Sequence, residues 1–126
     1  MNNRISTLVE DGLNLVCYAF GNPNDNTIFM CPGLGATQQG FAEDATCFAS
    51  KGFYVVTMDL RGQGESDRPV KIANQAFTLQ VLASDIELVL HNLNQTEVHF
   101  VSNSLGGVIG LQLLRRKHAK FIVFLM

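Results

Sequence analysis

The segment HFVSNSLGGV, residues 99–108, places a strand pattern directly before a helix pattern. Its first half is an apolar run typical of a buried strand, and apolar residues recur at helical spacing after Ser104. Almost no loop separates the two patterns, so Ser104 is expected to take a strained backbone conformation. The small residues Ser102 and Gly106, two positions before and after it, would let the strand and helix backbones pass closely. We therefore expect the Ser104 hydroxyl to project above the carboxyl end of the strand, where open α/β sheets bind ligands.

Strand and helix patterns alternate on both sides of this segment, without repeats or a linker. The expected strands are residues 5–9, 13–20, 27–31, 53–58, 98–101 and 121–125, and the expected helices lie within 41–49, 79–93 and 105–114. Continuous apolar runs such as 27–31 are typical of strands buried on both faces of a parallel sheet. The alternation predicts right-handed crossovers and an α/β fold, with a mostly parallel sheet and helices on both faces.

Composition indicates one globular domain over residues 1–126. The charges do not form the basic pattern that would bind a polyanionic partner. The net charge is −2, which argues against binding to nucleic acid or an anionic membrane. Only 16% of the residues are charged, against about 25% in typical soluble domains, so we expect a core segment of a larger unit. The N-terminus has no apolar signal segment and no run is long enough to span a bilayer, so a cytoplasmic location is expected.

The three cysteines, Cys17, Cys31 and Cys47, match no metal-ligand spacing. Each has apolar neighbours, so buried free thiols are expected. We expect neither a metal ion nor a cofactor.

Three motifs together resemble the α/β-hydrolase family. The segment around Ser104 is similar to its nucleophile elbow, Gly-x-Ser-x-Gly between a strand and a helix, with Ser102 in place of the first glycine. Residues 30–35, MCPGLG, stand where the family has its oxyanion loop, with Pro32 in place of the usual histidine. Residues 58–66, MDLRGQGES, are similar to the family's Asp-x-Arg-Gly-x-Gly-x-Ser segment. The resemblance covers nearly the whole chain, as strands one to six of a usual eight.

The resemblance implies roles for individual residues. Ser104 would be the nucleophile, and the backbone N–H groups of Leu34 and Leu105 would form the oxyanion hole. The residues that would shape the loop and the elbow are Gly33, Ser102, Gly106 and Gly107. Polar residues and glycines of the third motif are interpreted as structural, forming turns and loop hydrogen bonds; they are Asp59, Arg61, Gly62, Gly64 and Ser66.

The acid and the histidine that complete the family's triad normally follow the nucleophile in sequence, and neither is found before Met126. His91, His99 and His118 occupy positions unsuited to a base. We therefore expect a domain truncated after about strand six, without its lid and C-terminal strands. In the family order 1-2-4-3-5-6-7-8, strand six is interior, so residues 121–126 are expected to form an exposed edge and to promote self-association.

Three functional hypotheses remain open. The first is a serine hydrolase acting on ester, thioester, amide or related bonds of a small-molecule substrate. The second is a catalytically inactive, truncated member of the same family. The third is a flavodoxin-like binding module with Gly33-x-Gly35 as an anion loop. In the least specialised interpretation, Ser104 is only a helix N-cap whose hydroxyl accepts backbone N–H groups.

Overall fold

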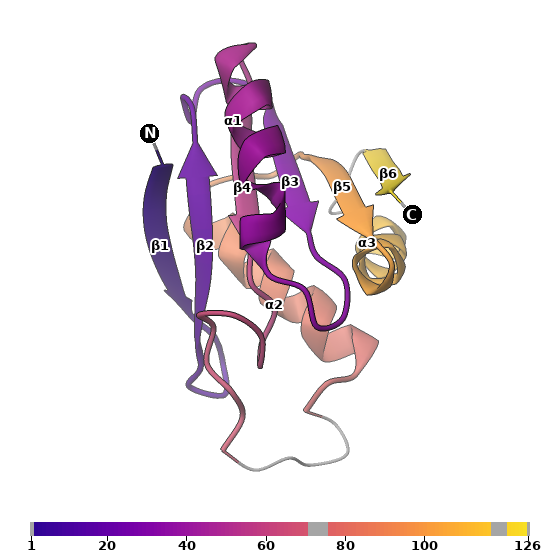
Figure 1. Ribbon diagram of the computed structural model, residues 1–126. Helices are drawn as coiled ribbons and strands as arrows, with labels where there is room; N and C mark the ends of the chain where they lie inside the picture. Colours follow the sequence, from indigo (N-terminus) through magenta and orange to yellow (C-terminus); the bar gives the residue numbers. More distant parts are fainter. Residues whose placement is uncertain (1, 71–75, 117–120, 126) are drawn as a thin grey trace.

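A single six-stranded sheet runs through the computed structural model, which describes residues 2–70, 76–116 and, as backbone, 121–125 (Figure 1). The strands are β1 (Asn2–Leu8), β2 (Asn14–Phe20), β3 (Thr27–Cys31), β4 (Tyr54–Met58), β5 (His99–Asn103) and β6 (Phe121–Leu125). Their order is β1-β2-β4-β3-β5-β6. β1 and β4 both pair antiparallel with β2, and the remaining pairs are parallel. The predicted mostly parallel sheet and its strand order are therefore confirmed.

Helices cover both faces of the sheet, as predicted. A short 3-10 helix, η1 (Gln38–Phe41), leads into α1 (Ala42–Ser50). The chain then forms α2 (Leu79–Asn92) and α3 (Leu105–Arg115). Because side chains alternate along a strand, Phe29 packs in the core with α2 and α3, whereas its neighbours Ile28 and Met30 pack in the core with α1. In the described residues, no helix combines the length and apolar character needed to cross a bilayer.

One of the cysteine predictions is wrong. Cys17 and Cys31 are buried in the core, as expected, but Cys47 is exposed on α1. Cys47 follows the buried Ala45 by two positions, which is about 200° around a helix, so it lies on the opposite face. The exposure of Cys47 is set by the face of α1 on which it lies, and not by the apolar residues beside it in the sequence.

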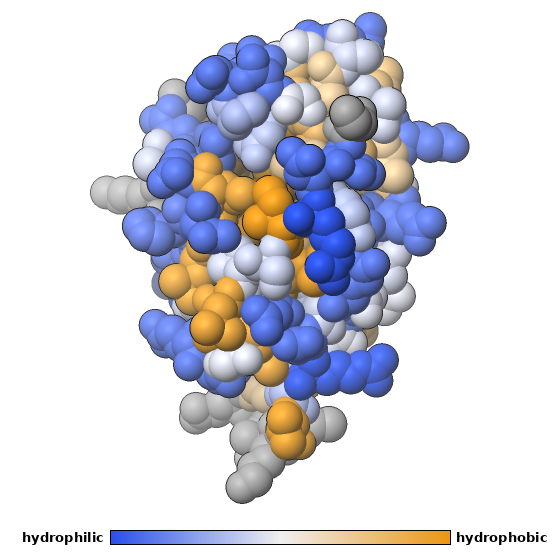
Figure 2. Space-filling view, turned by 90° about the vertical axis from the view of Figure 1, so that its left-hand side faces the viewer, coloured by the Kyte–Doolittle hydropathy of each residue, from blue (hydrophilic) through white to orange (hydrophobic). Residues whose placement is uncertain are grey.

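The two edges of the sheet differ in how they are protected. Figure 2 shows the side of the molecule where β1 is outermost, with apolar surface interrupted by hydrophilic side chains. On this edge strand, Arg4 forms a 3.2 Å ion pair with Glu65, and charged groups of this kind discourage pairing with another strand. At the other end of the strand order, β6 pairs with β5 on one side, and no described strand lies beyond it.

A polypeptide of residues 1–126 is therefore expected to self-associate through β6, whose sequence FIVFL has no charge, proline or glycine. Sedimentation velocity at tens of micromolar would detect this, with the double variant Ile122→Lys, Phe124→Lys as the comparison. A monomeric parent polypeptide would contradict the expectation.

Candidate functional site

Ser104 occupies a sharp junction between β5 and α3, as the sequence predicts. Its backbone has φ 51° and ψ −117°, and Asn94 is the other described non-glycine residue with a positive φ. A non-glycine residue held in such a conformation costs about 1–3 kcal/mol. The residue is exposed, at the carboxyl end of β5 and at the first turn of α3. The strained turn thus presents the hydroxyl to solvent at the positive end of a helix dipole.

Ser104 occupies the N-cap position of α3, but the interpretation that its hydroxyl accepts backbone N–H groups of the helix is wrong. Its side chain makes no capping hydrogen bond in α3. Thr78, by contrast, caps α2 in the ordinary way, because its hydroxyl accepts a 3.2 Å hydrogen bond from the Val81 N–H. The Ser104 hydroxyl is therefore not used to stabilise its own helix.

The lack of side chains at Gly106 and Gly33 allows the elbow at Ser104 to pack closely against the end of β3 and the residues that follow it. A Cβ on Gly106 would lie 2.5 Å from the Cys31 carbonyl oxygen, and one on Gly33 would lie 3.2 Å from the Ser104 Cβ. The sequence predicted that Gly106 lets the helix pass close to its own strand, whereas the closest backbone to a Cβ at this position is the end of β3. Elsewhere in the elbow, Ser102 is buried, and the Gly107 N–H donates a 2.9 Å hydrogen bond to the Ser104 carbonyl.

The side-chain amide of Gln63 holds the loop that follows β3. Its Oε1 accepts a 2.9 Å hydrogen bond from the Gly35 N–H, and its Nε2 donates to the carbonyls of Gly33 at 3.2 Å and Ala36 at 2.9 Å. These bonds fix the backbone on both sides of Leu34. The sequence analysis missed Gln63, and the signal available was a polar side chain between two glycines of the third motif.

Leu34 and Leu105 meet at one cavity of about 260 Å³. Leu34 follows Gly33, which contacts Ser104, and Leu105 is the next residue after Ser104. Within the described part of the chain, no acceptor takes the backbone N–H of either leucine. The structure therefore brings together the nucleophile candidate and both predicted oxyanion donors at one end of the sheet.

The polar residues of the third motif are structural, as predicted. The Asp59 carboxylate accepts hydrogen bonds from the backbone N–H groups of Gln38 at 2.7 Å and Glu65 at 2.9 Å. The Ser66 hydroxyl donates to the Asp59 carbonyl at 2.6 Å and accepts from the Val16 N–H at 2.9 Å. These bonds join the loop after β4 to β2 and to the first residue of η1.

The same motif contributes a buried guanidinium. Arg61 forms a bidentate pair with Asp85 of α2, with Nε–Oδ2 at 2.6 Å and Nη2–Oδ1 at 2.8 Å. Its remaining donors reach Asp11 and the Ala76 carbonyl. Arg61 therefore ties α2 to the turn between β1 and β2.

Neither described histidine lies beside Ser104. His91 is exposed near the C-terminal end of α2. His99 is at the first position of β5, about 13 Å of strand away from the last, which precedes Ser104. His118 lies outside the described residues. The described residues thus place Ser104, the candidate nucleophile, near two candidate backbone donors, with no described histidine beside it.

Comparisons with known proteins agree with this fold. A family model described as "alpha/beta hydrolase fold" matches residues 26–122. The chain is 26% identical over 102 residues to bifunctional epoxide hydrolase 2 of Sus scrofa, covering 81% of this chain and 18% of that protein. It is 35% identical over 101 residues to 3-oxoadipate enol-lactonase 1 of Acinetobacter baylyi, covering 80% and 36%. A mutant epoxide hydrolase structure from Vigna radiata superposes with a TM-score of 0.88 at 21% identity, covering 99% of this chain and 38% of that one. The chain thus spans less than half the length of each of these relatives.

Proposed function

The chain belongs to the alpha/beta hydrolase fold family, and we propose that it carries the nucleophile and oxyanion hole of a serine hydrolase acting on small-molecule esters, thioesters, amides or related acyl compounds. The observation that carries this proposal is the exposed Ser104 at a strained junction, with its hydroxyl released from capping. Backbone strain of this kind persists only where the surrounding structure imposes it, and it gathers at functional sites. The glycine contacts of the elbow supply that imposed geometry.

In the proposed reaction, the Ser104 Oγ attacks the carbonyl carbon of the substrate and gives its proton to a general base. The tetrahedral intermediate places a negative oxygen where the N–H groups of Leu34 and Leu105 can donate to it. The bond from carbon to the leaving group then breaks, and the leaving group takes the proton. Water attacks the resulting Ser104 ester in the second half of the reaction, releasing the acid and restoring the hydroxyl.

An acyl substrate suits a serine better than an epoxide does, although two of the similar proteins carry epoxide hydrolase in their names. If the Ser104 oxygen opened an epoxide ring, the product would be an ether between enzyme and substrate. Water does not hydrolyse such an ether under mild conditions, so the enzyme would be consumed. An acyl-serine ester, in contrast, is readily hydrolysed, because its carbonyl carbon is attacked a second time.

The flavodoxin-like alternative needs free N–H groups in the loop at Gly33–Gly35. The Gly35 N–H is already bonded to Gln63 and is not available to an anion, which argues against a cradle formed by several N–H groups of this loop. A serine hydrolase also needs a base and an orienting acid, and we place both outside the described residues.

A fluorophosphonate probe tests the proposal, because it reacts with a serine only when the hydroxyl is activated. We expect the full-length protein to gain one phosphonyl group, located on Ser104 by tandem mass spectrometry and absent in Ser104→Ala. Failure to label Ser104 in the folded protein would favour the alternative of a catalytically inactive family member. Labelling at another serine would overturn the assignment of the nucleophile.

Replacing Gln63 by leucine is expected to lower kcat about tenfold with little change in KM. The three hydrogen bonds of its amide hold Leu34 in place, and losing one oxyanion donor altogether costs about 10²–10³ in kcat. Steady-state kinetics on a chromogenic ester would measure the split between kcat and KM. The matched control is Gln39→Leu, an exposed glutamine of η1. Equal effects of the two substitutions would contradict the role of Gln63.

A further inference from the structure

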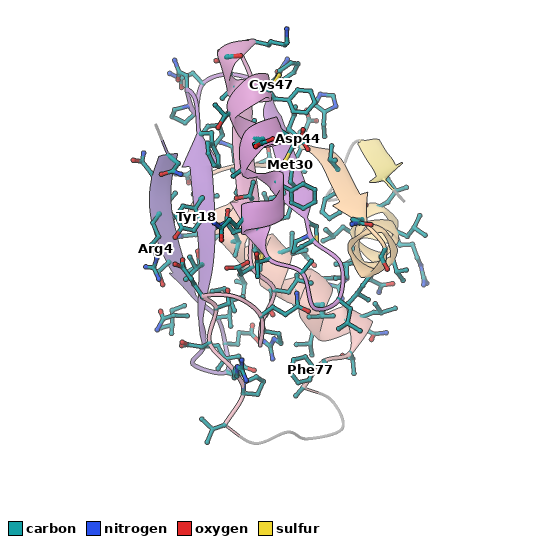
Figure 3. All side chains as sticks on the ribbon, in the orientation of Figure 1. Arg4, Tyr18, Met30, Asp44, Cys47 and Phe77 are labelled. Atoms are coloured by element: carbon teal, nitrogen blue, oxygen red, sulfur yellow. The ribbon has the colours of Figure 1, made fainter. Side chains whose placement is uncertain are left out.

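The cavity lined by Leu34 and Leu105 has mostly apolar walls among the described residues. Its volume is about 260 Å³, and the residues that line it include Leu34, Leu60, Phe77, Leu82 and Leu105. Leu34 and Phe77 form its open rim, with 80% and 46% of their surfaces exposed. Figure 3 shows Phe77 just before α2, at the end of the molecule toward which β3 and β5 run. A group bound here would lie next to the two candidate oxyanion donors.

Arg61 lines the same cavity but has no donor left for a ligand. A guanidinium has five N–H groups. Nε donates to Asp85, Nη1 to Asp11 and the Ala76 carbonyl, and Nη2 to Asp11 and Asp85. All five are therefore engaged, and its charge is balanced by two carboxylates.

Gln63, the other long polar side chain of the wall, is engaged in the same way. Both N–H groups of its amide face the carbonyls of Gly33 and Ala36, and its oxygen accepts from Gly35. A ligand in the cavity thus meets leucine and phenylalanine side chains, and it meets polar groups chiefly at the backbone N–H donors.

The Phe77 ring forms one wall of the cavity and is held there by close contact with the backbone of Gly62. A Cβ on Gly62 would lie 3.1 Å from the Phe77 Cε1, so the ring packs directly on the glycine. The absence of a side chain at Gly62 therefore decides where the ring stands. Because Phe77 is half-exposed and precedes α2, it can be replaced without opening the main core.

We propose that this cavity binds the acyl group of the substrate and that it selects small, uncharged, apolar acyl chains over chains that carry a carboxylate. This inference rests on the proposed function and assigns its substrate class. The volume is slightly below the roughly 300–1,000 Å³ of pockets for drug-sized ligands, so the chain is short. Each buried methylene strengthens binding about fourfold, whereas a carboxylate without a partner loses its hydration.

The test compares p-nitrophenyl acetate, butyrate and hexanoate with the half-ester p-nitrophenyl glutarate, whose acyl chain resembles hexanoyl in length. With the full-length protein, we expect kcat/KM for butyrate or hexanoate to exceed that for acetate at least tenfold. We expect the glutarate half-ester to fall at least tenfold below hexanoate. Equal or better hydrolysis of the glutarate ester would overturn the proposal.

A charge placed on the rim gives the complementary result. Phe77→Lys is expected to lower the hexanoate-to-glutarate ratio at least tenfold, because the new ammonium group pairs with the carboxylate. The control is Phe48→Lys, a phenylalanine of α1 with 37% exposure on the other face of the sheet, which should leave the ratio unchanged. A ratio that moves equally in both variants, with melting curves showing that both fold, would overturn the assignment of Phe77.

Binding to the Ser104→Ala variant separates this inference from the proposed function. N-methylhexanamide and N-methylglutaramate cannot report hydrolysis there, so shifts of the Leu34 and Leu105 amide NMR signals measure binding alone. Saturable shifts with the hexanamide and at least tenfold weaker binding of the glutaramate would support the cavity assignment even if no ester is hydrolysed. Hydrolysis that depends on Ser104 without this preference would leave the hydrolase standing and refute the acyl specificity.

Discussion

Substituting alanine for Ser104 is expected to reduce kcat/KM of the full-length protein on an acyl substrate by at least about 10⁴-fold. In the proposed reaction the Ser104 hydroxyl oxygen forms the acyl-enzyme, and no other described serine stands at a strained, exposed strand–helix junction. Some rate above the uncatalysed reaction should survive, because the backbone donors still bind the developing oxyanion. Initial rates with an ester of an apolar acid, measured with excess enzyme, would quantify the loss.

The control for this substitution is Ser50→Ala at the end of α1. Its hydroxyl bonds to the Cys47 carbonyl within the same helix, so kcat/KM should change less than about twofold. If Ser104→Ala retained a tenth or more of the activity, the nucleophile would have to be another group. Circular dichroism of both variants would establish that the loss is chemical, because alanine at the elbow keeps the Cβ that Gly33 contacts.

Substituting alanine for Asp85 is expected to destabilise the fold by about 3–5 kcal/mol, the usual effect of removing one partner of a buried ion pair. The Asp85 and Arg61 side chains are 4% and 2% exposed, so the buried guanidinium would keep its charge but lose two of its five hydrogen bonds. Burial raises the pKa of Asp85, while the hydrogen bonds from Arg61 oppose that rise. Urea unfolding followed by circular dichroism would give the change in the free energy of unfolding.

Asp11 provides a matched control, because it binds the same guanidinium from the surface. Its side chain is 51% exposed, so water replaces most of what Asp11→Ala removes, and the expected loss is about 1 kcal/mol or less. Similar losses for the two variants would show that the pair is not effectively buried. A loss confined to Asp85→Ala would show that burial, rather than the number of hydrogen bonds, determines the stability of this site.

Much of the fold could be predicted from local patterns. The strand predicted at 27–31 coincides with β3, and the elbow at Ser104 appears where a strand pattern meets a helix pattern without a loop. Both predictions rest on short-range chemistry: apolar runs need burial, and a chain that turns sharply needs small residues beside the turn. The prediction that Cys47 is buried was wrong, because the exposure of this residue depends on which face of α1 packs against the sheet.

The sequence by itself determined the α/β class, the position of the strand–helix elbow at Ser104 and the structural role of the segment from Asp59 to Ser66. Only the tertiary structure decided how the site is supported. Gln63 reaches back to a loop about 30 residues earlier, and Arg61 pairs with Asp85 on a helix 24 residues later. A hydrogen bond or ion pair between distant residues forms only where the whole sheet brings their two backbone segments close together. The sequence spacing of these residues therefore does not predict it. The apolar character of the cavity follows from the same pairings, because they leave its polar wall residues without donors for a ligand.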